Sequence, residues 1–419
     1  MAQRDRILII GNGFDLYHEL PTKYSQFIEV LKNLEIIEIT KDTIITFDDI
    51  FKDVDKFSEM KSRFNTEEMI FDEIKIAELK SNLINNKWYY FFKENIEFEN
   101  WIDFENEIKE TLIIFNSITK SIKNILHKNT FVYEIFINPT YEIGAYLYLN
   151  EKALKTASNF NLINEENELI NENYFFKINE SFIKFKSDVF FEDLFLDLQN
   201  FISIFNIYLN NVLSCFYPNI DSSFSSSLEK INLDINKFYT FNYTPTLENL
   251  YNIDSDKVSY LHGKHHIDSQ NIVLGIDEIN TELINDKIFM FTKYYQKLFN
   301  NTDYQFLSEM KISTSKYDSA DKDFILFGHS LADNDQNYLL ELFNVTKQRD
   351  QNTITILYHN INDKSQKLKN LLKIIGRNDI EFLMKKKRLI FIAINDNPFE
   401  TVFKILPTGS NDSYAPEIF

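Results

Sequence analysis

Cysteine is almost absent from this sequence. Cys215 is the only one in 419 residues, so the chain cannot form an internal disulfide bond or a zinc site built from several cysteines. Long apolar runs are absent too, since no stretch reaches the ~18 to 20 apolar residues of a membrane-spanning helix. The four-residue apolar run that begins at residue 7 is too short for the core of a signal peptide. We therefore expect a cytoplasmic protein that does not enter membranes.

Positive charge is also scarce. The chain has 44 lysines and arginines against 63 aspartates and glutamates, a net charge of −19. Non-specific binding to nucleic acid depends on basic residues that neutralise phosphates, and docking on anionic membranes needs them as well. The chain is therefore a poor candidate for either role. A small phosphorylated ligand stays possible because backbone N–H groups can hold it.

Glycine and proline are few, at 8 and 7, whereas aromatic residues make up 15% of the chain. The aromatic residues supply ample core, so we expect a folded protein. Few glycines mean few places where the backbone can turn freely, so their positions are informative. The length predicts one large domain with an insertion, or two domains.

Short runs of apolar, aromatic and β-branched residues predict strands at both ends of the chain. They cover residues 7–10, 238–242, 258–262, 272–274, 324–327, 353–358 and 389–394. Helical spacing of apolar residues at 24–38, 338–347 and 364–375 separates several of them, and this alternation is typical of a mostly parallel, doubly wound α/β sheet.

The middle of the chain has a different pattern. Residues 40–232 contain one glycine, Gly144, and long segments with helical spacing, such as 69–84 and 182–216. We predict a mainly helical insertion over 40–232 and a core formed by 1–39 and 233–419. The polar stretch 161–173 predicts a surface loop, and the serine-rich stretch 221–227 predicts a linker.

The first candidate site follows the N-terminal strand directly, at Gly11-Asn12-Gly13-Phe14-Asp15. The first glycine allows a sharp turn, and the second allows the backbone to approach a phosphate. Leu16 stands where the dinucleotide fingerprint has a third glycine, so the pattern is not that of a standard dehydrogenase. An ordinary strand-to-helix turn fits the spacing equally well. Asp15 either caps the following segment or binds a ribose hydroxyl.

Two further candidates end the next predicted strands. Asn242 has donor and acceptor atoms that can fix a hydroxyl or a water, or it can cap the helix whose first turn has Pro245. His262, followed by Gly263, is a candidate general base or a structural histidine. His265 and His266 raise metal binding as an alternative, but no regularly spaced carboxylate or cysteine supports it, so we expect no metal.

The fourth candidate is Gly328-His329-Ser330, where a strand end precedes a helix. Leu331 and Ala332 follow, so this is not the Gly-x-Ser-x-Gly elbow of a serine hydrolase. Five of the eight glycines lie in or just after these strand ends: Gly11, Gly13, Gly263, Gly275 and Gly328. Since carboxyl ends of parallel strands share one edge of a sheet, we expect a single nucleotide-binding cleft.

These motifs resemble those of the AbiH family of bacterial phage abortive-infection proteins. The opening Gly11–Leu16 and Leu20–Tyr24 carry the resemblance, with Glu19 where a glycine is common. It extends through 101–105, 241–244 with 247–248, 261–263, 274–275, 293–296 and 327–331 with Asp335. The resemblance implies a role in defence against phage.

More remotely, the same order of motifs is similar to sirtuin-like domains of antiviral defence. That resemblance implies a Rossmann-like fold and hydrolysis of NAD to nicotinamide and ADP-ribose. It gives Asn242 and His262 the catalytic roles, and it assigns ligand binding to the two glycine-containing motifs, with Asn12, Phe14, Gly263 and His329 beside them. The structural zinc of sirtuin deacetylases needs four cysteines, so deacetylation is not expected.

The sequence therefore predicts a phage-defence effector that binds and cleaves NAD. One alternative is a nucleotide-sensing or partner-binding module without catalysis. A weaker one is a metal-dependent nuclease that uses Asp103, Glu105 and Glu107. A phage-derived trigger, a cognate defence protein and a homo-oligomer are the partners that a defence effector implies.

Overall fold

The computed structural model describes residues 4–40, 43–94, 101–127, 149–163, 171–178, 181–222, 235–266, 271–277, 287–302, 306–307 and 320–394. Everything below concerns these residues. Most of the loop predicted at 161–173 and of the linker predicted at 221–227 lies outside them.

A six-stranded parallel sheet forms the core. Its strands are β1 (Arg4–Ile10), β6 (Lys237–Thr240), β7 (Val258–Tyr260), β8 (Asp321–Phe327), β9 (Thr353–Tyr358) and β10 (Leu389–Ala393). They lie side by side in the order β10-β9-β8-β1-β6-β7, each parallel to its neighbours. Numbered along the chain, this order is 3-2-1-4-5-6, the order of a doubly wound Rossmann fold. The predicted mostly parallel, Rossmann-like sheet is confirmed.

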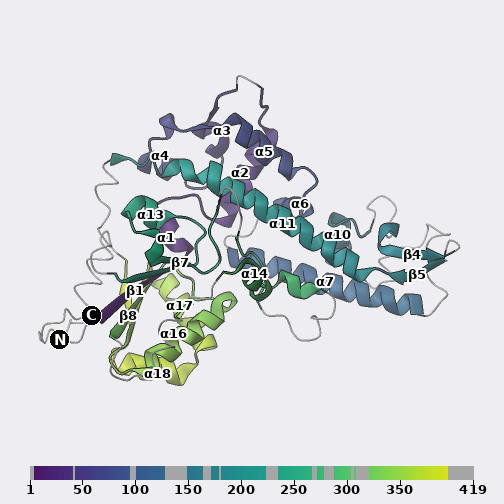
Figure 1. Ribbon diagram of the computed structural model, residues 1–419. Coiled ribbons are helices and arrows are strands. Elements are labelled where there is room, and N and C mark those ends of the chain that lie inside the picture. The colour runs from purple at the N-terminus through teal and green to yellow at the C-terminus, as the bar shows by residue number, and fades with distance from the viewer. Residues whose placement is uncertain are drawn as a thin grey trace, which may run out of the picture.

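Both faces of the sheet are buried, which explains the continuous apolar run of β1. Ile7 and Ile9 pack on one side with α16 (Gln336–Gln348), α17 (Ile361–Ile374) and α18 (Arg377–Lys385). Leu8 and Ile10 pack on the other side with α1 (Asn12–Tyr17) and α13 (Thr246–Tyr251). Figure 1 shows the two sets of helices on opposite sides of the strands.

A helical layer lies against this α/β core. Its helices are α2 (Tyr24–Ile36), α3 (Phe47–Phe51), α4 (Phe57–Arg63), α5 (Glu73–Leu83), α6 (Lys87–Glu94), α7 (Trp101–His127), α10 (Glu151–Asn159), α11 (Ser187–Asn211) and α14 (Lys293–Asn300). Two short two-stranded antiparallel sheets belong to it, β2 (Ile45–Thr46) with β3 (Ile70–Phe71) and β4 (Phe175–Ile178) with β5 (Ser181–Phe185). Short 3-10 turns are η1 (Thr66–Glu68), η2 (Glu172–Tyr174), η3 (Leu213–Phe216), η4 (Ser255–Lys257), η6 (Ile288–Phe291) and η7 (Asp333–Asp335).

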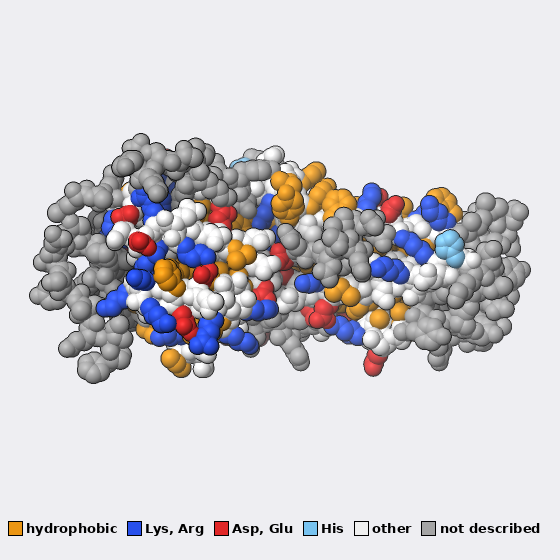
Figure 2. Space-filling model, turned by 90° about the horizontal axis from the view of Figure 1, so that it is seen from below, with side chains coloured by type: hydrophobic (Ala, Val, Ile, Leu, Met, Phe, Trp, Pro, Cys, Tyr) orange, Lys and Arg blue, Asp and Glu red, His pale blue; other side chains and the backbone are white. Residues whose placement is uncertain are grey.

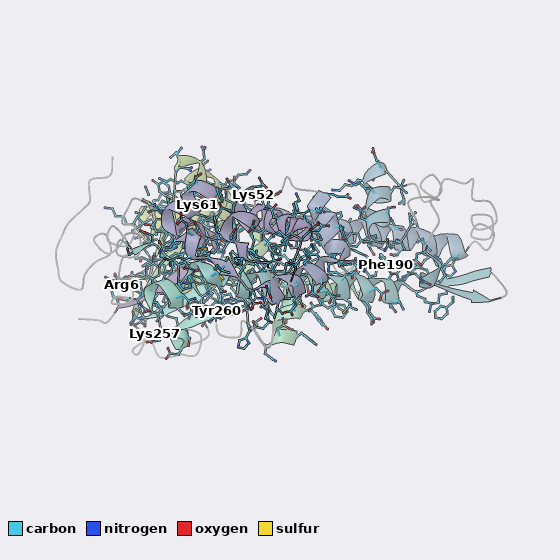
Figure 3. The ribbon with its side chains drawn as sticks, turned by 90° about the horizontal axis from the view of Figure 1, so that it is seen from above. Arg6, Lys52, Lys61, Phe190, Lys257 and Tyr260 are labelled. Carbon is cyan, nitrogen blue, oxygen red and sulfur yellow. The ribbon has the colours of Figure 1, made fainter. Side chains whose placement is uncertain are left out.

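The two longest helices, α7 and α11, extend away from the sheet. Together with α10, β4 and β5 they form an arm (Figure 1). Seen from above, Phe190 of α11 lies in this arm, whereas Arg6 and Tyr260 mark the sheet at the other end (Figure 3). None of the helices among the described residues combines the length and apolar character needed to cross a membrane.

The helical layer has its own hydrophobic core, which includes Phe27 and Leu31 of α2 as well as Leu274 and Phe291. By packing, α2 therefore belongs with the helical layer, although it precedes residue 40. The boundaries at 39 and 233 stay a prediction.

The strand predicted at 272–274 is wrong, because these residues are buried without joining a sheet. The side-chain amide of Gln296 takes the place of a neighbouring strand. Its Oε1 accepts from the backbone N–H of Leu274 at 3.1 Å, and its Nε2 donates to the Leu274 carbonyl at 3.0 Å. Burial without a ladder is possible because both backbone groups are satisfied.

Charge is unevenly distributed over the surface. Residues 361–388, which include α17 and α18, contain nine basic and three acidic residues in a chain whose net charge is −19. Figure 2 looks at the side on which these helices lie, and lysines and arginines gather over that part of it. The average charge therefore does not describe this face.

Candidate functional site

The cavity lies where the topology of a doubly wound sheet predicts a ligand site. The chain leaves β1 towards α1 on one side of the sheet and leaves β8 towards α16 on the other, so a crevice opens between their carboxyl ends. The cavity there has a volume of about 150 Å³. The sheet side of its wall is formed by Gly11, Asn12, Asp15, Phe241, Asn242, Tyr243, Thr244, His262, Gly328, His329, Ser330, Asn334 and Asp335. The helical layer adds Pro21, Thr22, Phe27, Glu105, Phe205, Tyr208, Leu209 and Lys293.

The glycine-containing motifs after β1 and β8 touch each other across this crevice. A Cβ atom on Gly13 would lie 2.7 Å from the Cα of Gly328, and one on Gly328 would lie 2.2 Å from the backbone nitrogen of Phe14. Gly328 also has a φ of +72°. Gly13 and Gly328 are therefore needed because their two backbones lie so close together. The sequence had predicted instead that Gly13 lets the backbone approach a phosphate.

The turn after β1 is short, because α1 begins at Asn12. Three of its N–H groups are already engaged: Gly11 donates to the Phe327 carbonyl at 3.0 Å, Gly13 to the Gly328 carbonyl at 2.8 Å, and Phe14 to the Gly11 carbonyl at 2.8 Å. These three donors stabilise the turn itself, and phosphate binding by the loop stays a prediction.

Asp15 links the turn after β1 to the segment that follows β6. Its carboxylate accepts hydrogen bonds from the hydroxyls of Thr244, at 2.5 Å, and Thr246, at 2.6 Å. The residue is 1% exposed. Burial raises the pKa of Asp15 to about 6, although the hydrogen bonds from Thr244, Thr246 and Asn242 oppose that effect.

Asn242 lies at the carboxyl end of β6 and is buried. Its backbone N–H donates to the hydroxyl of Thr240 at 2.9 Å, and its Nδ2 donates to the Gly11 carbonyl at 3.1 Å. Asn242 therefore lines the cavity and also fixes the turn after β1. The alternative that it caps the following helix does not apply, because α13 begins at Thr246 with Pro245 as its N-cap residue.

His262 faces Asp335 from the carboxyl end of β7. The two side chains approach to 3.2 Å between His262 Nε2 and Asp335 Oδ1, but the angle makes no hydrogen bond, and neither atom has a hydrogen-bond partner among the described residues. Burial and then the charge of Lys293 lower the pKa of His262 to about 3, against the opposing charge of Asp335. The imidazole is therefore neutral near pH 7, and this contact is not an ion pair.

His329 has a defined tautomer. The backbone N–H of Leu331 donates to its Nδ1 at 2.9 Å, so the ring proton sits on Nε2. That atom lies 3.4 Å from Asp335 Oδ2. The ring of Phe241 packs between the two histidines, with centroid distances of 4.2 Å to His329 and 5.3 Å to His262.

A buried charge cluster completes the wall. Lys293 Nζ lies 2.8 Å from Glu105 Oε1 and 3.5 Å from Asp335 Oδ1, and Asn334 Nδ2 donates to Glu105 Oε2. Burial lowers the pKa of Lys293, but the charges of Asp335 and Glu105 outweigh it and hold that pKa above its usual value. Burial raises the pKa of Glu105. Burial acts to raise the pKa of Asp335, but the charge of Lys293 opposes it, and that pKa lies well below its usual range.

The structure brings most of the predicted site residues together. Gly11, Asn12, Asp15, Asn242, His262, Gly328, His329 and Ser330 line the cavity. Three others do not: Gly13, Phe14 and Gly263. Phe14 is fully buried in the core beneath the sheet, and Gly263 has a φ of +81° that allows the chain to pass close to Asn271.

The sequence analysis did not assign Lys293 and Asp335 to the site, and it named Glu105 only for the nuclease alternative. Each is a single residue on or before a helix with no local pattern that marks it. The signal that could have found them was the family resemblance, which covers 101–105, 293–296 and Asp335. Among the described residues, no group of three or more histidine, cysteine, aspartate or glutamate side chains has the arrangement of a metal site.

Comparison with known families decides the relationship. A family model described as bacteriophage abortive infection AbiH matches residues 7–358. The chain belongs to the AbiH family. The matched range contains every residue that lines the cavity of this AbiH protein. No curated protein and no solved structure matches the chain. Family membership makes the chain a phage abortive-infection protein, and the resemblance to sirtuin-like domains stays a prediction.

Proposed function

We propose that this AbiH protein acts as a defence effector that binds NAD in the cavity and hydrolyses it to nicotinamide and ADP-ribose. The observation that carries the proposal is the meeting of Asn242, His262 and the 328–330 motif in one cavity at the switch point. These are the residues on which the resemblance to NAD-hydrolysing domains rests. In the reaction, the bond from ribose C1′ to the nicotinamide nitrogen breaks, a water oxygen bonds to C1′, and one proton is released.

The electrostatics of the site fit this chemistry better than chemistry that needs a strong base. A neutral His262 with a pKa of about 3 is a weak base but a good hydrogen-bond acceptor. Nicotinamide leaves as a neutral molecule from a cationic ring, so the transition state develops positive charge on the ribose. The carboxylates of Asp335 and Glu105 line the same cavity and would stabilise a positive charge that develops beside them, and a weak base suffices for water to attack the ribose.

Surface charge supports the entry of an anionic nucleotide. Asn370 of the basic helix α17 donates to the backbone carbonyl of Ser330 at 3.1 Å, and Lys373 pairs with Asp333. The basic face therefore lies directly beside the cavity. Such a face raises the local concentration of a ligand that carries a pyrophosphate.

The proposal is tested by following nicotinamide release from NAD, with and without phage lysate. We expect Asn242→Ala and His262→Ala each to lower the rate by about 10²-fold or more. His359→Ala is the matched control, since this exposed histidine follows β9 outside the cavity. Because Asn242 also holds Gly11, its variant must be shown to fold. Activity that survives in both cavity variants overturns the mechanism.

A binding module without catalysis is the second candidate, and one observation favours it. Lys293 already compensates part of the negative charge of Glu105 and Asp335, which weakens their effect on a developing cation. Calorimetry with NAD and ADP-ribose distinguishes the two functions. Tight binding without nicotinamide release, with or without lysate, supports the module.

The nuclease alternative gains little from the geometry. Glu105 is paired with Lys293, whereas Glu107 faces Lys152 at 3.9 Å. The two carboxylates therefore do not converge on one metal ion. The side chain of Asp103 lies outside the described residues. Mg²⁺-dependent loss of DNA or RNA on incubation with the protein would revive this alternative.

A further inference from the structure

We propose that Lys293 is the positioning residue of the cavity, and that it couples the helical layer to the reacting end of the site. It joins Glu105 of the helical layer to Asp335 of the α/β core and so holds Asp335 beside His262. The effect on catalysis rests on the proposed function. The coupling itself is a property of the protein without ligand.

The position of Lys293 is set by its backbone. It is the first residue of α14, whose N-cap residue Thr292 accepts from the backbone N–H of Tyr295 at 3.2 Å. The N–H of Lys293 donates to the Ile276 carbonyl at 2.8 Å. Its side chain is only 6% exposed. A buried ammonium held in this way cannot reach solvent, so it must keep its carboxylate partners.

The three charged groups come from three separate elements. Glu105 is on α7, Lys293 begins α14, and Asp335 precedes α16. Asp335 does not cap its own helix, because its side chain makes no hydrogen bond to the first turn of α16. Its carboxylate turns towards Lys293 and the two histidines instead. The bridge is therefore the electrostatic contact that fixes this carboxylate in the cavity.

Counting charges shows why the bridge is sensitive. Two carboxylates and one ammonium give the cluster a net charge of −1. Without Lys293 the buried cluster would have a net charge of −2. If the charge of Glu105 were removed as well, the net charge would return to −1. Buried like charges repel strongly when water does not screen them. Removing Lys293 alone should therefore be more harmful than removing Lys293 together with the Glu105 charge.

The bridge also gives the helical layer a role. α7 carries Glu105 at the cavity and continues into the arm (Figure 1), and α11 adds Phe205 and Tyr208 to the same wall. A movement of α7 relative to the sheet would displace Glu105 from Lys293. The position of Lys293 beside Asp335 would change in turn. The arm is in this way coupled to the reacting end of the cavity.

The test compares Lys293→Met with Lys297→Met. Both remove one positive charge from α14, but only the first breaks the bridge. His262 is faced by Asp335, Lys293 and, more weakly, Lys297. Loss of Lys293 is expected to raise the pKa of His262 by about one unit or more, measured by NMR of the imidazole ring with His262→Gln for assignment. Equal shifts in the two variants would overturn the proposal.

Two further variants keep the test decisive if Lys293→Met folds poorly. The double variant Lys293→Met with Glu105→Gln is expected to restore folding in part. The conservative variant Lys293→Arg is expected to keep the pKa of His262 and most of the nicotinamide release. If the double variant is no better folded than Lys293→Met, the charge bridge is wrong. If the wild type releases no nicotinamide while the NMR shifts appear as expected, the proposed function fails and the positioning role stands.

Discussion

Replacing Asp15 with asparagine should remove a large part of the pH dependence of folding. Asp15 is fully buried, and burial raises its pKa from 3.8 to about 6. Between these two values the folded protein binds a proton at this site that the unfolded chain has already released. Stability from this group is therefore fully present below pH 3.8 and is lost as the pH rises through 6.

The size of the effect follows from the gap between the two pKa values. A gap of about two units at about 1.4 kcal/mol per unit corresponds to about 3 kcal/mol. Solvent does not screen the carboxyl of Asp15, because the residue is buried, so the full value applies. Asparagine does not titrate, so relative to the variant the wild type should lose about 3 kcal/mol of its free energy of unfolding between about pH 3.5 and pH 7.

Urea unfolding of both proteins across this pH range measures the difference. Asp49→Asn is a control of opposite sign, because hydrogen bonds from Thr46 lower the pKa of Asp49 and its contribution is lost on acidification. The reasoning is refuted if the stability curves of wild type and Asp15→Asn run parallel. That outcome would mean that the two threonine hydroxyls compensate for burial completely.

Two further changes test the geometry of the cavity wall. Gly328→Ala should destabilise the fold by about 2 kcal/mol or more, because the new Cβ meets the backbone of Phe14 and the positive φ is strained for alanine; thermal unfolding measures this, and an unchanged melting temperature contradicts the close approach. Tyr208→Phe should cost about 1 kcal/mol, because the buried hydroxyl donates to the Pro21 carbonyl at 2.7 Å; urea unfolding without any loss of stability would show that the acceptor finds another donor.

Much of the sheet could be predicted because its strands are buried on both faces. Such strands appear as short continuous apolar runs, and 353–358 matches β9 residue for residue. The run at 272–274 is also short, apolar and buried, yet it is no strand. Its backbone is satisfied by the side chain of Gln296, more than twenty residues away in the chain. No local pattern marks such a substitution for a strand.

The candidate site was predictable where it depends on topology. Once β1 and β8 are neighbours, Gly11 and Gly328 must lie at one edge of the sheet. Spacing alone could not show what each glycine approaches. Gly13 has the position of a phosphate-binding glycine, but the atoms beside it belong to Gly328.

The charged wall was beyond prediction from local pattern for a different reason. Glu105 and Lys293 are single residues on amphipathic helices, where a charge normally faces solvent. Only packing shows that both are buried against Asp335. The α/β core supplies the histidines and one carboxylate, while the helical layer supplies the second carboxylate and the ammonium. Because the ammonium that balances the carboxylate of Asp335 lies in the other layer, the contact between the layers determines the electrostatics of the site.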